Sequence, residues 1–180
     1  MDYQKSTVHN VVSKQSDVTI PNTLSDDVVS MLNDRLADEY AAHYFYRGAA
    51  NWCQSVAYVK AAAFFAAEAA TELEHAEKIQ KYLVDWNATP MLPAVKFNSE
   101  FASLIDVVNK SYAIEFSLLE KYNKDSAEVF SKHLPTFDFL QNYREIQTES
   151  VAEYSDKLNA AQLIDVSSKL DLLHYEERYF

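Results

Sequence analysis

Glu72 and His75 lie three residues apart in the segment Glu72-Leu73-Glu74-His75, and side chains at this spacing project from one side of a helix. A carboxylate and an imidazole placed in this way can bind one or two metal ions. The segment alone is weak evidence, because Glu-x-x-His also arises by chance on acidic helices that face solvent. Its meaning therefore depends on what the rest of the chain supplies.

Three other helical segments each carry one polar side chain on an otherwise apolar face: Glu39, Glu115 and Gln147. Burying such a group is costly unless a partner satisfies it. With Glu72 and His75 they form an oxygen-rich ligand set with one imidazole, which suits Fe(II) or Mn(II) better than a thiolate-selective metal. A carboxylate shared between two cations would also relieve the repulsion among the acidic groups.

Tyr46 lies two turns beyond Glu39 on the same face, where it could hydrogen-bond a ligand or donate an electron. His43 lies between them, and two interpretations stay open: a hydrogen-bond donor to a ligand, or a satisfied core histidine. The other tyrosines on these faces are expected to be core residues whose hydroxyls find partners.

The elements that must position these residues are helices separated by prolines. The stretch 22–89 is free of proline and would form a rod of about 100 Å at 1.5 Å per residue, so it must fold back as a hairpin. We expect the reversal near 54–57 and the first helix to begin at Ser25. The remaining helices are expected over 58–85, from near Ser99 to Pro135, from Pro135 to about Leu163, and over about 166–178.

Length and composition limit the alternatives. The 180 residues suit one domain, and we expect an N-terminal extension over 1–24, flexible and without helical periodicity, followed by one four-helix-bundle domain over 25–180. The single glycine excludes glycine-rich phosphate loops, and with only four prolines it argues against a turn-rich all-β fold.

Charge and hydropathy exclude further classes of partner. The formal net charge of −11 would repel nucleic-acid phosphates and anionic lipid, and no stretch approaches the roughly 18 apolar residues that span a bilayer. The first 25 residues lack the pattern of a secretory signal, so we expect a cytoplasmic protein with no nucleic-acid or membrane partner. Cys53, the single cysteine, is expected to be a buried thiol.

From about Leu24 onward the sequence resembles the bacterial non-haem ferritins. Signatures stand in family order: Leu32-Asn33-Asp34-Arg35, Glu39-Tyr40, Trp52-Cys53, Ala62-Ala63-Phe64-Phe65, Glu72-Leu73-Glu74-His75 and Pro135-Thr136-Phe137-Asp138-Phe139-Leu140-Gln141. The resemblance implies an all-α, ferritin-like four-helix bundle with a long crossover between helices two and three and a short fifth helix. It also implies a homo-oligomer assembled as a hollow 24-subunit shell.

The resemblance implies a ferroxidase centre with two irons per subunit. Glu39, Glu72 and His75 would hold the first iron, and Glu72 would bridge to a second iron held by Glu115 and Gln147. The implied reaction oxidises two Fe(II) with O2, after which Fe(III) is stored in the cavity as a hydrated oxide mineral.

Tyr46 completes the implied catalytic set, because it matches the family's tyrosine beside the centre that assists electron transfer to oxygen. The positions matching the family's third iron site are Thr71, Ile146, Glu149 and Ser150. Only Glu149 keeps a carboxylate there, so a third site of the usual kind is not expected. Glu68, one turn before Glu72, is not a usual family ligand and is a second auxiliary candidate.

Other members of the wider superfamily fit less well. The fourth helix lacks a second Glu-x-x-His, which argues against the symmetric di-iron site of bacterioferritins and rubrerythrins, and no suitably placed methionine predicts a haem ligand. Two alternatives from other classes stay open: a non-catalytic shell subunit that nucleates mineral, and a detoxifying di-iron oxidase or peroxidase.

Overall fold

The computed structural model describes residues 24–96 and 100–180. These residues form five helices and no strand: α1 (Asp26–Ser55), α2 (Val59–Asp85), α3 (Leu104–Val129), α4 (Leu134–Ala161) and α5 (Lys169–Tyr179). The predicted all-α architecture, four long helices and a short fifth, is confirmed. The predicted extension 1–24 lies outside the described residues except for Leu24, which is buried.

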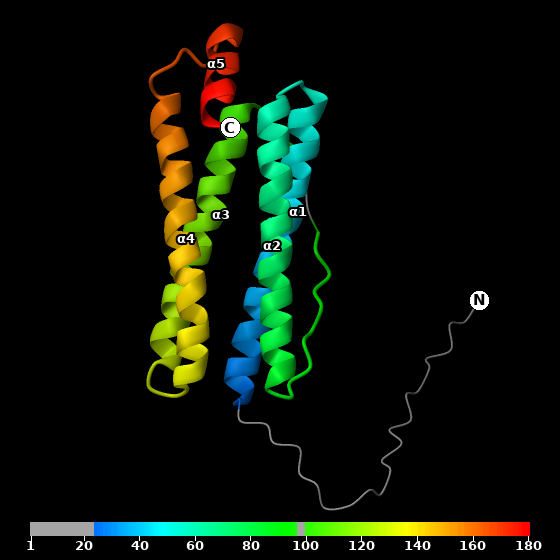
Figure 1. The fold of residues 1–180 in the computed structure, drawn as a ribbon, viewed down its shortest axis with the longest axis vertical. Coiled ribbons are helices and arrows are strands. Elements are labelled where there is room, and N and C mark those ends of the chain that lie inside the picture. The colour runs from blue at the N-terminus through cyan, green and yellow to red at the C-terminus, as the bar shows by residue number, and fades with distance from the viewer. Residues whose placement is uncertain (1–23, 97–99) are drawn as a thin grey trace, which may run out of the picture.

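Two antiparallel hairpins, α1 with α2 and α3 with α4, pack side by side as a four-helix bundle (Figure 1). α2 ends at one end of the bundle and α3 begins at the other, so the connection 86–103 joins opposite ends, as the predicted long crossover requires. The helix α5 lies at the end where α1 turns into α2. Within the described part of the chain, no helix is both long and apolar enough to cross a membrane.

The reversal between α1 and α2 falls at 56–58, within one residue of the predicted region. Ala57 adopts a left-handed backbone with φ 67°, and the amide of Tyr58 returns to the carbonyl of Cys53 at 2.9 Å. Asn87 ends α2 in the same way, with φ 58°. Glycine usually occupies this position at a helix end, so alanine carries a steric cost here.

The third helix begins later than predicted. We expected a start near Ser99, but α3 starts at Leu104, where the Ser103 hydroxyl accepts the amide of Asp106 at 3.1 Å. The prediction was wrong because Ser103 followed by Asp106 supplies both a cap and a first-turn acid, a stronger start signal than Ser99 with Glu100. Ser25 caps α1 as predicted in position, but its side chain makes no capping hydrogen bond.

The fifth helix supplies the cap that α2 lacks. Tyr58, at the start of α2, makes no side-chain cap, and the carboxylate of Glu176 instead accepts the backbone amides of Lys60 at 2.6 Å and Ala61 at 3.1 Å. A carboxylate at this position satisfies free amides and complements the helix dipole. The Tyr175 hydroxyl donates to the Lys157 carbonyl at 2.8 Å, so α5 also holds α4.

The bundle has one apolar core that runs along the facing sides of the four long helices. Fully buried members include Leu32, Leu36, Phe65, Ile79 and Leu140, and side chains of this kind contribute roughly 1.5–3 kcal/mol each when buried. Cys53 is buried, as predicted, and burial raises the pKa of its thiol to about 12. Polar side chains interrupt this core near its middle.

Candidate metal centre

The polar group nearest the middle of the core comes from α1 and α2. Glu39 of α1 and Glu72 and His75 of α2 each offer one ligand atom, and these atoms lie within 4.8 Å of one another. His75 Nδ1 is 3.1 Å from Glu72 Oε2 and 3.6 Å from Glu39 Oε2. Glu72 and His75 therefore share one face of α2, as their spacing predicts, and this face is turned toward the Glu39 carboxylate of α1.

A second pair comes from α3 and α4. Glu115 and Gln147 are both closed to solvent. In the amide orientation that satisfies its neighbours, the Gln147 nitrogen donates to Glu115 Oε2 at 2.6 Å and to the Glu115 main-chain carbonyl at 3.2 Å. The Tyr46 hydroxyl donates to Glu115 Oε1 from the other side. Each of the four long helices thus buries a polar side chain near its midpoint, and Glu115 is close enough to Glu39 and Glu72 to interact with their charges.

Burial and missing partners make this cluster unusual for a protein core. Glu39 is fully buried, and its Oε2 accepts no hydrogen bond, although it lies within ion-pair distance of His75. Buried polar atoms are nearly always satisfied in native proteins, and buried charges are paired or bind metals. An orphaned carboxylate oxygen beside an imidazole and a second carboxylate is the arrangement that a cation would complete.

Without a cation, the surroundings of the cluster favour protonated side chains. Burial raises the pKa of Glu72 well above its usual range, and the charges of Glu39 and Glu115 add to this effect while the hydrogen bond with His75 opposes it. Burial alone would lower the pKa of His75, but the carboxylates of Glu39, 3.6 Å away, and of Glu72, hydrogen-bonded at 3.1 Å, raise it to about 10.

Glu115 behaves in the same way. Burial raises its pKa to about 7, the hydrogen bond from Tyr46 opposes the rise, and the charges of Glu39 and Glu68 contribute to it. A divalent cation favours the ionised carboxylates and the neutral imidazole, so it would displace these protons.

Tyrosines that sequence reasoning placed in the core support the cluster directly. Tyr122 of α3 donates its hydroxyl to Glu39 Oε1, and Tyr143 of α4 donates to the main-chain carbonyl of His75 at 2.9 Å. The sequence indicated partners for these hydroxyls but not that the partners are candidate ligands. Their positions along the helices could have indicated this, since each shares a helical face with a predicted ligand: Tyr122 with Glu115, and Tyr143 with Gln147.

The remaining candidates differ in position. Glu68 is half-buried and accepts the Tyr154 hydroxyl at 3.3 Å, and burial followed by the charge of Glu153 raises its pKa. Glu149 is exposed on α4 and faces a polar surface pocket, away from the core. His43 Nδ1 lies 2.5 Å from the Ala69 carbonyl, so its partner is α2 backbone rather than a candidate ligand.

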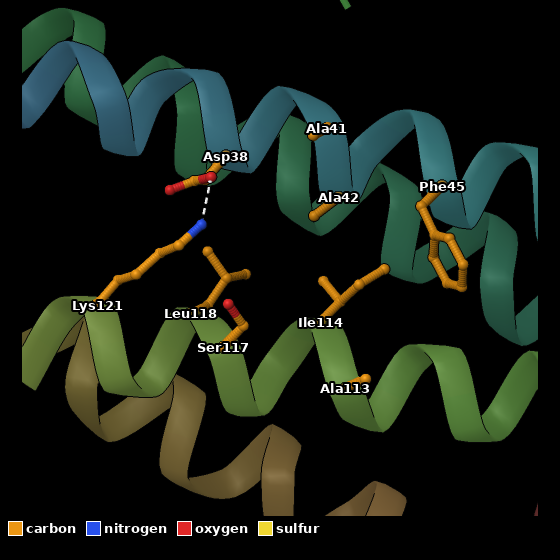
Figure 2. Close-up of a pocket in the computed structure, with 9 residues that line it drawn as sticks. All are labelled: Asp38, Ala41, Ala42, Phe45, Ala113, Ile114, Ser117, Leu118 and Lys121. Atoms are coloured by element: carbon orange, nitrogen blue, oxygen red, sulfur yellow. Dashed lines mark hydrogen bonds and ion pairs between the residues drawn. The ribbon is translucent and has the colours of Figure 1, made fainter. Parts of the chain in front are cut away.

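An apolar surface groove of the bundle is separate from the cluster. A groove of about 340 Å³ between α1 and α3 is lined by alanines and by Phe45, Ile114 and Leu118 (Figure 2). Lys121 closes one end through an ion pair with Asp38, Nζ to Oδ1 2.7 Å. None of its lining residues is a candidate ligand.

Glu74 and Glu77 are exposed on α2, and Gly48 is buried in α1. The group formed by Glu39, Glu72 and His75 is the one cluster of three or more such side chains with metal-binding spacing in the described ranges. Glu68 and Glu149 do not belong to it.

Comparison with known proteins gives a consistent set of similarities. A family model described as a ferritin-like domain matches residues 29–164. A bacterial non-haem ferritin of Campylobacter jejuni is 32% identical over 78% of this chain and 86% of its own length. A bacterial non-haem ferritin of Staphylococcus aureus is 28% identical over 86% of this chain and 94% of its own length.

Among solved structures, an open-pore ferritin from the hyperthermophilic archaeon Archaeoglobus fulgidus superposes with a TM-score of 0.82. The two sequences are 23% identical, and the superposition covers 87% of this chain and 98% of the archaeal chain. At this identity the likeness concerns the fold.

Proposed function

We propose, on the premise that this chain belongs to the ferritin family and to its bacterial non-haem type, that it is an iron-storage ferritin with ferroxidase activity. Its substrates are Fe(II) and O2, and its product is Fe(III) stored as a hydrated oxide mineral. The observation that carries the proposal is the buried cluster in which Glu39, Glu72 and His75 converge around an unpartnered carboxylate oxygen.

Five side chains are proposed to bind two Fe(II). Glu39 and His75 would bind the first iron, Glu115 and Gln147 would bind the second, and Glu72 is the carboxylate proposed to bridge both. The oxygen-rich set with a single imidazole fits Fe(II), which carboxylates and imidazole favour. Two Fe(II) then supply the two electrons that reduce O2 to peroxide, so neither electron has to come from outside the centre.

Protons held by the metal-free cluster have to leave as iron binds. His75 must give up a ring proton to coordinate through Nδ1, and Glu115 must be ionised. Tyr46 donates its hydroxyl to the Glu115 carboxylate and would keep this proposed ligand of the second iron oriented. The buried, water-poor setting strengthens the attraction between the cations and their ligands.

The family also supports the proposal of a homo-oligomeric cytoplasmic shell, with 24 subunits as the expected number and no haem. The acidic net charge of −11 would draw cations toward such a shell. Exposed Glu149 does not complete a third iron site, and half-buried Glu68 remains the auxiliary candidate. The domain that performs this function is proposed to span 25–180.

The test is rapid mixing of metal-free protein with two Fe(II) per chain in air, followed by absorbance on the millisecond scale. A fast transient and then a stable Fe(III) signal are expected, and Glu72→Ala should abolish the fast phase. Glu74→Ala is the matched control, since Glu74 is exposed two residues away on the same helix. Slow oxidation identical in all three proteins would refute the catalytic assignment and leave a passive mineral shell.

A further inference from the structure

Aromatic rings form a continuous path from the candidate centre toward the surface near the end of α2. Tyr122, which donates to Glu39, stacks on Tyr143 with ring centroids 4.9 Å apart. Tyr143 contacts Phe139 at 5.3 Å, and Phe139 stacks on Tyr82 at 4.0 Å. Aromatic pairs at these distances are ordinary in cores, so contact alone assigns no role.

The far end of the path differs from core packing because Tyr82 has a proton acceptor within reach. The Tyr82 hydroxyl lies 3.0 Å from Thr136 Oγ1, which lies 2.7 Å from His133 Nδ1. The Thr136 backbone amide also donates to Nδ1, so this nitrogen is the unprotonated one. The Thr136 hydroxyl therefore donates to His133 and accepts from Tyr82, which makes a two-step proton path from phenol to imidazole.

The other two tyrosines of the path lack such an acceptor. Tyr143 donates to an amide carbonyl, that of His75, which is a poor base. Tyr122 donates to Glu39, whose carboxylate is a candidate iron ligand. Tyr122 and Tyr143 are buried, whereas Tyr82 is half-buried and lies where a reductant in solution can approach.

Tyr46 of α1 and its neighbour Tyr154 differ from Tyr82 in exposure. Tyr46 donates to Glu115 and stacks on Tyr154 at 6.1 Å, and the Tyr154 hydroxyl donates to Glu68. Tyr46 and Tyr154 are both fully buried. An oxidised Tyr46 or Tyr154 ring would therefore be closed to reductants in solution.

We propose that Tyr82 is a redox-active residue that supplies one electron to the centre through Phe139, Tyr143 and Tyr122 when hydrogen peroxide meets a chain holding a single Fe(II). The inference rests on the proposed iron oxidation and adds a protective branch to it. The radical is thereby drawn to a half-buried site with a proton acceptor, where external reductants can restore the phenol.

The step balances with the groups named. Hydrogen peroxide takes up two electrons and two protons to become two waters, and its O–O bond breaks. Fe(II) supplies one electron and becomes Fe(III), while Tyr82 supplies the other and becomes a neutral phenoxyl radical. The Tyr82 proton passes through Thr136 to His133, and the two protons consumed at the centre come from solvent.

The experiment adds one Fe(II) per chain to the metal-free protein, then hydrogen peroxide, and follows Fe(III) absorbance together with the tyrosyl signal by electron paramagnetic resonance. Wild-type protein should give a radical that ascorbate removes quickly. In Tyr82→Phe the radical should remain on buried tyrosines and decay with ascorbate several-fold more slowly. Tyr112→Phe is the control, because Tyr112 is half-buried on α3, outside the path.

Thr136→Val tests the proton path separately, since it keeps Tyr82 and the shape of the side chain. The Tyr82 signal should fall about tenfold or more, because a positioned proton acceptor accelerates such transfers by roughly 10²–10⁴. Normal Fe(III) formation with identical radicals in wild type, Tyr82→Phe and Thr136→Val would overturn the Tyr82 assignment and leave the ferroxidase proposal standing. Loss of iron oxidation in the wild type would overturn both.

Discussion

Metal binding at the buried cluster should release protons, and the number follows from the pKa values of its ligands. His75, with a pKa of about 10, carries its second ring proton at pH 7 and must lose it to bind a cation. Glu115, with a pKa of about 7, is half protonated there. Saturation at pH 7 should therefore release about 1.5 protons per chain, and any proton held by Glu72 adds to this number.

The sign of the pH dependence is fixed by the same groups. Below pH 6 Glu115 is protonated as well, so the release rises toward about two protons, whereas at pH 9 it falls toward one. Apparent metal affinity should then increase by about 30-fold per pH unit near pH 7. Isothermal titration with Zn(II), which undergoes no redox chemistry, in buffers of different ionisation enthalpy measures the release directly.

Two variants sharpen this measurement. Glu115→Gln should lower the release at pH 7 by about half a proton, and Glu74→Gln, on the exposed side of α2, should leave it unchanged. A release below about half a proton at pH 7, or one that grows between pH 7 and pH 9, would refute the protonated state assigned to the metal-free cluster.

Three further changes test the scaffold by chemical denaturation of the metal-free protein. Ala57→Gly should stabilise the chain by about 0.5–1 kcal/mol, because it relieves the left-handed backbone at φ 67° in an exposed turn. Glu176→Ala should destabilise it by about 1–2 kcal/mol through loss of the cap on α2. Arg35→Met should destabilise it by about 2–4 kcal/mol, because Asp125, 3.5 Å from the guanidinium and nearly buried, loses its counter-charge.

Each of these expectations can fail in a specific way. A destabilised Ala57→Gly variant would mean that unfolded-state entropy outweighs the strain at this turn. An unchanged Glu176→Ala variant would mean that water caps α2 equally well. An unchanged Arg35→Met variant would show that solvent reaches Asp125 despite its burial.

The fold was largely predictable because its signals are local. Apolar periodicity and the four prolines set the number of helices, and the reversal at 56–58 was located although alanine replaces the expected glycine. The start of α3 was missed by about five residues, because the sequence offers both Ser99 and Ser103 as a cap followed by an acid, and α3 begins after Ser103. The capping of α2 by Glu176 could not be foreseen, since it joins residues 115 positions apart in sequence.

For the candidate centre, the sequence predicted the ligand residues but not the hydrogen bonds that surround them. Helical register predicted that Glu72 and His75 share one face. Glu39, Glu115 and Gln147, each a polar residue on an otherwise apolar helical face, were predicted to be buried in the same core. Register does not say which hydroxyl meets which carboxylate, because that depends on the rotation of each helix against its neighbours. The contacts of Tyr122 and Tyr143 with the ligands therefore emerged only from the packed bundle.

The cap supplied by Glu176 also orders events during synthesis of the chain. The first turn of α2 leaves the ribosome 115 residues before the carboxylate that caps it, a delay on the order of ten seconds at ordinary translation rates. During that interval the amides at the start of α2 lack the Glu176 cap, and the buried side chains of α1 and α2 lack their partners from α3 and α4. Closure of the bundle and docking of α5 then complete the hairpin at the same stage, so the domain is fully folded only once its C-terminal helix has emerged.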